Sequence, residues 1–555
     1  MLHSKKCCNA HLSVALTEGI SCAHLALSEP LPHWLGAVAL TVPLAACGGS
    51  SQEAAAGGDA IVRVPGTEPQ QGLIPAMTNE NGGGRVVDML YSGLIYYDAD
   101  GEVHNEMAES IDKEGEKTYK VTLKPDITFS DGTPVTAATF VDTWNYAVAN
   151  EQLNESFFSS IKGYGEGVKE MEGLKVLDDR TFTIELTQPE SDFPSRLGYN
   201  AYFPLPPEAL EDPQGFGENP VSNGPYRLKE WNHNQNIVLE PNPEYGGERT
   251  PKNDGLEFVF YADSGASYMD LLSNNLDVLE AIPSSAFGNY EQDLGERQET
   301  KPAATYLEMS IHVDTPHFSG EEGALRRRAV SMAIDREEIA KTIFHGTRTP
   351  AREFTSPVLQ GYSDSLPGSE NLDYNPEKAK KLWAEADKKY GAFEDTFPIN
   401  YNTDGDNKDW ADAVANSISN TLGIRAVGNP YPDFKSFREA YRAERMDGAY
   451  RTAWFADYPS MGNFLGPNFT TGVASNDSKY SNPEFDELIV KANGANSPEE
   501  AAKLYNQAQE LLLRDLPAIP LFYPNVVGGW SENVSNVTFN WKSLPVYYEI
   551  EKTVQ

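Results

Sequence analysis

The chain has 555 residues, of which 40% are apolar and 11% aromatic, and its formal net charge is −38 at pH 7. This length is too great for one hydrophobic core, and at about 150 residues per domain it predicts three or four domains. The negative charge argues against nucleic-acid binding, which needs basic surface to displace counterions from phosphates, and against adsorption to anionic lipid.

The start of the chain carries the features of an export signal. The apolar run Trp34–Ala46 is too short to span a bilayer and has the length of a signal-peptide core. It leads into Leu44–Cys47, which resembles the bacterial lipobox, in which the cysteine is lipidated and becomes the mature N-terminus. The alternative is an ordinary signal peptide with a chance cysteine. Cys47 is also the last cysteine, which excludes a disulfide framework, a zinc–cysteine site and a cysteine nucleophile from the body that follows.

One feature of this segment differs from an export signal. Glu18 and Glu29 stand where such a signal is normally basic. Either the true start lies downstream of Met1, or the segment before Pro32 is artefactual, and both leave the prediction of export in place. We expect residues 1–46 to be the signal peptide and residues 47–59 to hold the lipidated cysteine and a flexible Ala/Gly/Ser-rich tether. No later stretch is apolar enough for a membrane helix, so the lipid would attach the chain to the membrane.

The first half of the body is rich in strand and turn signals. Ala60–Val64 predicts a strand, and alternating apolar residues predict a half-buried strand over Lys117–Lys124. Gly82–Gly84 is followed by no Gly-Lys-Ser/Thr, so it is not a phosphate-binding loop, and it predicts a turn before a helix at Arg85–Tyr91. Val176–Leu186 predicts a hairpin.

The second half is richer in helices with recognisable starts. Such signals are Asp335 with Glu338, Asn375-Pro376 and Ser497-Pro498, and an earlier one stands at Thr136. Ile519–Tyr523 has the composition of a buried strand. These patterns predict an α+β body with mixed sheets.

The segment Arg451–Leu465, RTAWFADYPSMGNFL, is the candidate binding segment. If the chain is extended from Arg451 to Asp457, these two side chains share one face. A guanidinium at one end and a carboxylate at the other suit a zwitterion, such as a short peptide whose free carboxylate and free amine are a few residues apart. The alternative is an aspartate that caps a turn and an arginine paired with a surface acid.

Several stretches together resemble one known family. They are Phe129–Trp144, Ser222–Tyr245, Arg326–Ile339, Tyr374–Ala386, Trp454–Leu465 and Tyr480–Leu488. In this order they resemble the family 5 extracellular solute-binding proteins, the oligopeptide- and dipeptide-binding receptors of ABC importers. The resemblance extends over nearly the whole body.

The resemblance implies a mixed α/β fold of two lobes, that of a type II (cluster C) periplasmic binding protein with an extra inserted domain and two hinge strands. It implies a core domain of lobe I from residues 60–88, 220–306 and 525–555, an inserted second domain over 89–219, and lobe II over 307–524. The hinge crossings are expected near Tyr306–Met309 and Leu521–Pro524. Ligand would bind between the lobes, which close over it by rotation at the hinges.

The resemblance also assigns roles to single residues. It implies that Asp457 holds the free amine of a peptide and that Arg451 holds its carboxylate. A second carboxylate-binding arginine falls at Arg442, or at Tyr441 when counted from the other side. The remaining candidate ligand-binding residues are Glu68, Phe434 in place of a pocket tryptophan, Asn407 in place of a histidine, and the aromatic residues Trp454, Phe455 and Tyr458.

The function that the resemblance implies is capture and delivery without chemistry. We expect a monomeric lipoprotein on the outer face of the cytoplasmic membrane, on its extracellular or periplasmic side. It would bind peptides of about two to five residues or longer and present them to permease subunits that work with cytoplasmic ATPases. No nucleic acid, cofactor or metal is expected.

Three other functions are weighed against this one. An exported hydrolase is disfavoured, because the sequence has neither a Gly-x-Ser-x-Gly elbow nor a His-Glu-x-x-His helix. The same fold could bind another solute, such as a sugar or a metal chelate, but such a site would not need Asp457 and Arg451 as opposite poles. A surface sensor built on the same lobes is the third alternative.

Overall fold

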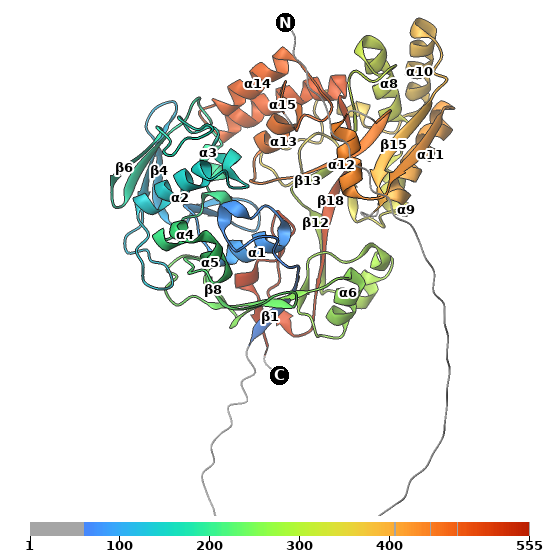
Figure 1. The fold of residues 1–555 in the computed structure, drawn as a ribbon. Coiled ribbons are helices and arrows are strands. Elements are labelled where there is room, and N and C mark those ends of the chain that lie inside the picture. The colour runs from blue at the N-terminus through green and yellow to red at the C-terminus, as the bar shows by residue number, and fades with distance from the viewer. Residues whose placement is uncertain (1–59, 404–406, 444–445, 474, 554–555) are drawn as a thin grey trace, which may run out of the picture. The chain divides into compact units, whose positions relative to one another are not determined.

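The computed structural model describes residues 60–403, 407–443, 446–473 and 475–553. Cys47, the predicted signal peptide and the predicted tether lie outside these residues. The described chain combines mixed sheets with helices, as predicted (Figure 1). No helix within these ranges has both the length and the apolar composition that crossing a membrane requires.

The first sheet joins the start of the described chain to strands far along the sequence. Its order is β1 (Ile61–Gly66), β10 (Gly255–Phe260), β9 (Asn236–Pro241) and β8 (Tyr226–Asn232). β1 and β10 run parallel, and the other pairs are antiparallel. Helix α1 (Asn81–Leu90) contributes Val87 and Leu90 to the hydrophobic core that also holds side chains of this sheet.

Helix α1 corrects one sequence prediction. Gly82–Gly84 was expected to form a turn before the helix, but these glycines are its first turn. The cause is Glu80, whose carboxylate accepts hydrogen bonds from the backbone N–H groups of Gly82 and Gly83 at 2.6 and 2.8 Å. An acid at this place satisfies N–H groups that no helical carbonyl can reach, and so it starts the helix earlier.

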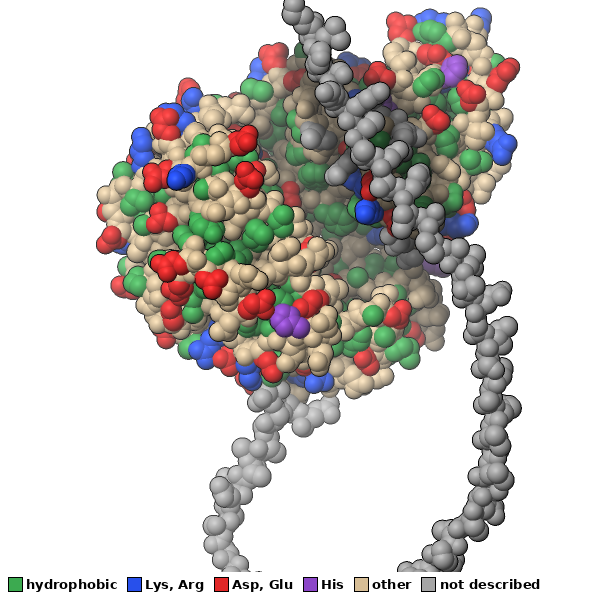
Figure 2. All heavy atoms as spheres, viewed as in Figure 1, with side chains coloured by type: hydrophobic (Ala, Val, Ile, Leu, Met, Phe, Trp, Pro, Cys, Tyr) green, Lys and Arg blue, Asp and Glu red, His purple; other side chains and the backbone are tan. Residues whose placement is uncertain are grey.

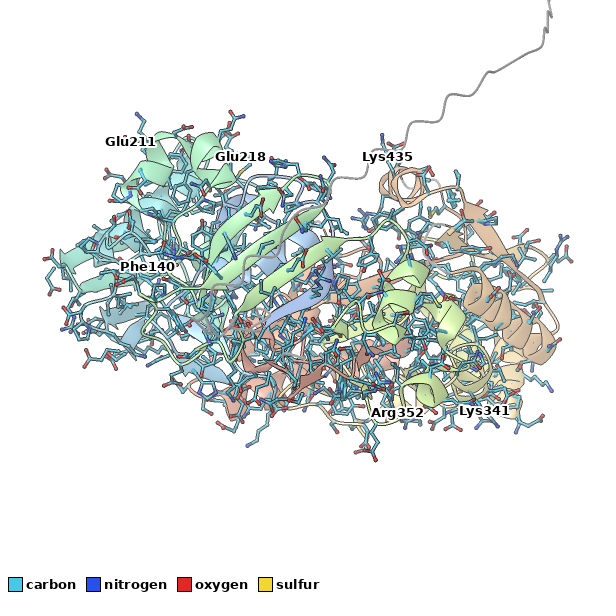
Figure 3. All side chains as sticks on the ribbon, turned by 90° about the horizontal axis from the view of Figure 1, so that it is seen from below. Phe140, Glu211, Glu218, Lys341, Arg352 and Lys435 are labelled. Atoms are coloured by element: carbon cyan, nitrogen blue, oxygen red, sulfur yellow. The ribbon has the colours of Figure 1, made fainter. Side chains whose placement is uncertain are left out.

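The second sheet is antiparallel and is covered by one helix. Its order is β4 (Ala108–Lys113), β5 (Thr118–Leu123), β7 (Thr181–Glu185) and β6 (Leu174–Asp178), which confirms the predicted strand and hairpin. Helix α2 (Ala137–Ala149), capped by Thr136 as predicted, packs Phe140 and Trp144 against it. Figure 3 shows Glu211 and Glu218 at the outer side of this part, on α4 (Pro207–Glu211) and α5 (Pro213–Glu218).

The third sheet is the largest in the described chain. Its order is β11 (Val278–Leu279), β18 (Ala518–Trp530), β13 (Thr305–Ile311), β17 (Ala449–Phe455), β15 (Thr396–Asn402) and β16 (Arg425–Tyr431), and β12 (Gln298–Pro302) and β14 (Arg348–Pro350) also pair with β18. All seven residues of β13 are buried.

β18 is the long strand of this sheet. Its first part pairs with β13 and β14, and its last part pairs with β12 and β11. The strands expected at Tyr306–Met309 and Leu521–Pro524 are therefore confirmed as parts of β13 and β18, and their role as hinges stays a prediction.

Helices flank this sheet at the upper right of Figure 1. They are α8 (Gly320–Met332), α9 (Arg336–Thr342), α10 (Pro376–Tyr390), α11 (Lys408–Leu422) and α12 (Phe434–Arg442). Three further helices lie at the upper centre of Figure 1: α13 (Met461–Phe469), α14 (Pro483–Asn493) and α15 (Pro498–Asp515). The predicted starts of α9, α10 and α15 are confirmed, because Asp335, Asn375 and Ser497 accept hydrogen bonds from the first turns.

Candidate functional site

The candidate site begins with a strand that has one unpaired edge. β17 pairs with β13 along its whole length, from Ala449 to Phe455. Its other edge pairs with β15 only at Ala449 and Tyr450. From Arg451 onward, no strand in the described part of the chain pairs with this edge. Backbone N–H and C=O groups along such an edge can bind an added extended chain.

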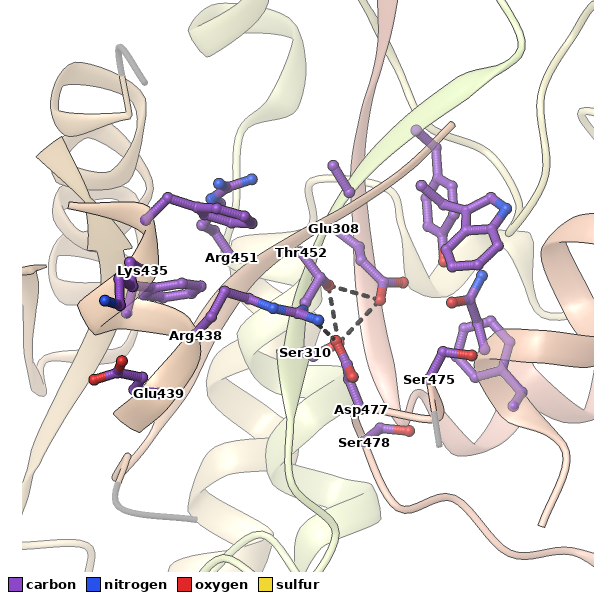
Figure 4. A pocket seen from close by; sticks show the side chains of 17 residues that line it. Glu308, Ser310, Lys435, Arg438, Glu439, Arg451, Thr452, Ser475, Asp477 and Ser478 are labelled. Carbon is purple, nitrogen blue, oxygen red and sulfur yellow. Dashed lines mark hydrogen bonds and ion pairs between the residues drawn. The ribbon is translucent and has the colours of Figure 1, made fainter. Parts of the chain in front are cut away.

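A cavity of about 670 Å³ lies beside this strand. β13, β17, α12 and the segment that follows α13 line it (Figure 4). Its charged lining residues are of both signs: Lys435, Arg438 and Arg451 are basic, and Glu308, Glu439 and Asp477 are acidic. A cavity with both signs of charge suits a ligand that also carries both.

Arg451, the predicted carboxylate ligand, lines this cavity and is well positioned. Its guanidinium lies over the rings of Phe434 and Phe437, at 5.1 and 5.7 Å from their centres. Its Nε donates a hydrogen bond of 2.8 Å to Oδ1 of Asn402 at the end of β15. Stacking and a hydrogen bond together fix a planar cation that can bind a carboxylate with two parallel bonds.

Arg438 is a second arginine of the cavity, and the sequence analysis missed it. The structure places Arg442 at the end of α12, but its side chain lies outside the described part. Arg438 stands one helical turn earlier, and its guanidinium lies over Tyr441 at 5.1 Å and 3.9 Å from Oδ2 of Asp477. The spacing of four residues, which puts Arg438 and Arg442 on one helix face, was the signal that could have found it.

Two acids of the cavity were also missed. Glu308 on β13 accepts hydrogen bonds of 2.9 Å from the hydroxyl groups of Ser310 and Thr452. Burial raises the pKa of the Glu308 carboxyl above its usual range. Burial also raises the pKa of Asp477 to about 7; neighbouring Glu308 adds to this, and Arg438 and Lys479 oppose it.

Asp457, the predicted amine ligand, does not line this cavity. β17 ends at Phe455, so the expectation of one extended face from Arg451 to Asp457 is wrong. Asn463, in the first turn of α13, holds the aspartate instead. Its Oδ1 accepts the backbone N–H of Asp457 at 3.0 Å, and its Nδ2 donates to the carboxylate at 3.2 Å. The buried amide of Asn463 thus binds both the backbone and the side chain of Asp457, and these bonds end the strand before it.

The surroundings of Asp457 come from distant parts of the chain. Burial raises the pKa of its carboxyl, while Asn463 and the ammonium of Lys542 oppose this rise. Lys542 lies over the rings of Tyr199 and Trp541 at 5.4 and 5.1 Å, and these three residues line a smaller cavity of about 100 Å³. Asp457 is therefore a partly buried carboxylate held by one amide, and such a carboxylate can bind a cation.

The aromatic candidates occupy different environments. Trp454 and Phe434 line the large cavity, and Nε1 of Trp454 donates to Asn463 at 3.1 Å. Phe455 is 71% exposed and lines none of the cavities described here. Tyr458 is buried beneath the guanidinium of Arg196 at 5.4 Å.

The structure brings Asn407 into indirect contact with the site. Asn407 is buried before α11 and donates hydrogen bonds to Asn402, at 3.1 Å to its carbonyl oxygen and 3.3 Å to Oδ1. Asn402 in turn accepts from Arg451. Asn407 thus positions the residue that positions the guanidinium.

Glu68 lies apart from the large cavity. Its carboxylate pairs with Nδ1 of His233 at 2.8 Å and accepts the backbone N–H of Asn234 at 2.7 Å. It lines a different cavity, together with Glu218 and Trp231.

One cluster within the described residues has the atoms of a metal site. Ligand atoms of Asp98, Glu102 and His104 lie within 4.8 Å of one another. Nε2 of His104 already lies 3.0 Å from Asp98, which also accepts the N–H groups of Asp100 and Glu102. This pattern of bonds is that of an ordinary turn, and we assign no metal to it.

Comparison with known proteins gives a consistent result. The sequence profile of the bacterial extracellular solute-binding proteins, family 5 Middle, matches residues 102–476, more than half of the chain. The dipeptide-binding protein DppE of Bacillus subtilis is 27% identical over 506 residues, which cover 88% of this chain and 91% of that protein. The oligopeptide-binding protein OppA of the same organism is 26% identical over 503 residues, covering 85% of this chain and 88% of that one.

Solved structures show the same fold. The unliganded open form of the periplasmic murein tripeptide binding protein MppA superposes with a TM-score of 0.76 at 22% identity, covering 89% of this chain and 97% of that one. Oligopeptide-binding OppA of Haemophilus influenzae gives a TM-score of 0.69 at 23% identity, with 89% and 99% covered.

Proposed function

Because the chain belongs to family 5 of the bacterial extracellular solute-binding proteins and has the two-lobed mixed α/β fold of that family, we propose that it captures short peptides for an ABC importer. Members of this family are binding proteins of transport systems and not enzymes. The relatives DppE and OppA are named for dipeptides and oligopeptides, which supports peptides as the ligand class.

One observation carries this proposal: the unpaired edge of β17 runs past a cavity that contains two arginines. The edge offers hydrogen bonds to any peptide backbone, whatever its side chains. Arg451, supported by Arg438, offers a cation for the carboxylate at the end of that backbone. The 670 Å³ of the cavity leave room for varied side chains and bridging water.

We further propose that Asp457 binds the free amine of the ligand. Its carboxyl is partly buried, accepts one hydrogen bond from Asn463 and has no lysine or arginine within ion-pair distance in the described chain. An ammonium group would offset the cost of this burial. Arg451 and Asp457 would then hold opposite ends of one peptide.

Calorimetric titration with matched peptides tests both ends. The ligands are tri- to pentapeptides of alanine in four forms: free, N-acetylated, C-amidated and blocked at both ends. Losing a desolvated charge partner costs about 2 kcal/mol or more. We therefore expect Arg451→Met to lower the affinity for peptides with two free ends by roughly thirty-fold or more. The same change should leave C-amidated peptides almost unaffected, and Asp457→Asn should leave N-acetylated peptides almost unaffected.

The variant Glu439→Gln is the control, because Glu439 lines the same cavity but is exposed on α12. Equal losses for free and amidated peptides in Arg451→Met would contradict the carboxylate assignment. If no peptide bound to the wild type, while a sugar or a metal chelate did, the peptide proposal itself would be wrong.

The attachment and delivery steps are part of the same proposal. We place the chain outside the cytoplasmic membrane, held by lipid on Cys47, where it hands its peptide to permease subunits with cytoplasmic ATPases. The lipobox-like Leu44–Cys47 and the family membership support this arrangement. We also propose that the chain acts as a monomer. Its domains would be the core of lobe I (residues 60–88, 220–306 and 525–555), the inserted second domain (89–219) and lobe II (307–524).

A further inference from the structure

The cavity beside Arg451 holds a buried acid that no basic side chain of the described chain neutralises. Glu308 is 5% exposed. Its Oε1 accepts hydrogen bonds from Ser310 and Thr452, whereas its Oε2 is buried and has no hydrogen-bond partner among the described residues. No lysine or arginine in the described chain lies within 4.0 Å of this carboxylate. An ionised carboxylate in such a place is costly unless a cation joins it.

A second carboxyl group faces the same space. Asp477 lies 3.9 Å from Arg438, at the outer limit of an ion pair, and lines the cavity together with Glu308. In Figure 4 the carboxylates of Glu308 and Asp477 lie around Ser310 and Thr452, while Lys435 and Arg451 lie on the other side, towards α12. Two acids that share one desolvated space repel each other, and one added cation would relieve both.

We propose that Glu308 and Asp477 form a subsite for a basic side chain of the bound peptide. The proposal rests on the peptide-binding function proposed above and specifies which peptides are preferred. The walls suit a lysine or arginine side chain, because Tyr306, Trp454 and Phe469 line the same cavity and would cover its methylene groups. The acids would meet the charged tip, and the hydroxyl groups of Ser310 and Thr452 would accept its remaining N–H groups.

Arg451 does not fill this subsite, and Arg438 reaches only its Asp477 side, at 3.9 Å. Arg451 and Thr452 alternate along β17, so their side chains leave opposite faces, and Glu308 stands opposite Thr452. Arg451 is held by Asn402, Phe434 and Phe437 on its own face.

The subsite and Arg451 line one cavity, and this limits where the basic residue stands in the peptide. Arg451 would bind the terminal carboxylate, and the acids line the same cavity. The basic residue is therefore the last residue of the ligand or the one before it. A basic residue at the amine end, towards Asp457, would gain nothing from these acids.

Peptides that differ by one charge test the proposal. The panel consists of Ala-Ala-Ala-Lys, Ala-Ala-Lys-Ala and Lys-Ala-Ala-Ala, each paired with a norleucine peptide that keeps the carbon chain and lacks the ammonium. We expect the wild type to bind lysine at least ten-fold more tightly than norleucine in one of the first two pairs, and equally in the third. Glutamate at the same position should bind more weakly than norleucine.

Three variants locate the preference. Glu308→Gln keeps the shape of the side chain and should reduce the lysine preference to less than three-fold while it preserves norleucine binding. Asp477→Asn should reduce the preference in part. Glu211→Gln, which changes an exposed acid on α4 outside the cavity, should leave it unchanged. Thermal unfolding of each variant checks that the fold is intact.

The number of protons released when the peptide binds is a second measurement. A change in the shape of the subsite alone would not alter it. Burial raises the pKa of Asp477 to about 7 and that of Glu308 above its usual range, so the Asp477 carboxyl is partly protonated near pH 6.5 before a ligand binds. The other titratable or charged groups around the pair are Tyr306, Tyr450, Lys435, Arg438, Glu439, Arg451 and Lys479. Titration in buffers of different ionisation enthalpy should show net proton release for the lysine peptide and none for its norleucine partner.

The outcomes separate the two proposals. Equal affinity for lysine and norleucine at both C-terminal positions, or a preference that survives in Glu308→Gln, would overturn the subsite and leave peptide binding intact. Failure of every peptide of the panel to bind would overturn the peptide function and the subsite with it.

Discussion

The position of the Arg451 guanidinium is fixed by its neighbours. Two phenylalanine rings and the amide of Asn402 hold it, and Asn407 holds Asn402 in turn. A guanidinium fixed before the ligand arrives loses less conformational freedom on binding, and this increases affinity without any new contact.

The first prediction concerns Asn402. Replacing it by alanine removes the hydrogen bond to Nε of Arg451, so the affinity for peptides with a free carboxylate should fall roughly five- to ten-fold. C-amidated peptides should bind Asn402→Ala as they bind the wild type. Calorimetric titration of both peptide forms measures the difference. A loss of the same size for both would show that Asn402 acts on the fold of the site and not on the arginine.

Arg451 can be recognised from the sequence and Glu308 cannot, for a physical reason. An arginine in an aromatic strand is conspicuous because the cation must find a partner. Glu308 stands in TYLEMSI, where alternation predicts an outward-facing, solvated acid. β13 is instead covered on both faces, and all its residues are buried, so alternation carries no information there.

At the scale of elements, β18 joins strands from separate stretches of the chain. It pairs with β13 and β14 near its start and with β12 and β11 near its end. Close packing surrounds its second half: a Cβ atom at Gly528 would lie 2.1 Å from the ring of Phe539. No side chain larger than hydrogen fits there without movement.

The second prediction follows from this contact. Gly528→Ala should lower the free energy of unfolding by about 1–3 kcal/mol, because the Phe539 ring must move within a packed core. Gly466→Ala is the matched control: a Cβ atom there meets nothing within 4 Å, and alanine favours a helix such as α13. Urea unfolding measures both. If Gly528→Ala left the free energy of unfolding unchanged, the Phe539 ring would be able to move aside without cost.

Glu353, which is hydrogen-bonded to β18, makes the stability of the fold depend on pH. It is fully buried, and its carboxylate accepts hydrogen bonds from Thr355 and Gln509, while its carbonyl oxygen accepts one of 3.0 Å from the hydroxyl of Tyr523 on β18. Burial raises the pKa of the carboxyl to about 7, and these hydrogen bonds oppose the rise only in part. Tyr362, Tyr523 and Arg352 are the other titratable groups nearby.

The third prediction states the sign of this effect. Between pH 4.5 and 7 the folded chain keeps a proton on Glu353 that the unfolded chain has lost, so stability falls as pH rises through this window. The loss amounts to about 3 kcal/mol at most, and it is complete above pH 7. Glu353→Gln should remove this slope whatever its absolute stability. Urea unfolding of both proteins at several pH values tests this, and an equal slope in both would assign the effect elsewhere.

Local elements could be predicted from the sequence, and their pairing could not. Thr136, Asp335 and Ser497 bond to backbone groups within four residues, so each helix start is determined by adjacent residues. The neighbours of β17 are β13 and β15, about 145 and 50 residues away. Nothing in RTAWFADY reveals that its far edge is unpaired, nor that Asn463 ends the strand before Asp457.

At the scale of the whole molecule, acids outnumber bases, and the formal net charge is −38. Figure 2 shows acidic side chains across the visible face, with lysines and arginines between them. Like charge keeps such a molecule dispersed and away from anionic lipid. A lipid on Cys47 would therefore have to provide the membrane attachment.

The fourth prediction tests that anchor. The full chain produced in a bacterium should partition into the detergent phase, whereas Cys47→Ala should remain in the aqueous phase with unchanged peptide affinity. Metabolic labelling with a radioactive fatty acid should mark the wild type alone. A wild-type protein that stays unlabelled in the aqueous phase would indicate an ordinary cleaved signal peptide.

The open side of β17 has an ecological consequence. If a peptide adds to this edge as proposed, the hydrogen bonds go to main-chain atoms, which are the same in fragments of any protein. A cell that used the chain in this way could take up peptides from many different proteins and would not depend on one of them. Glu308 and Asp477 would then only favour fragments with a lysine or arginine as their last residue or the one before it.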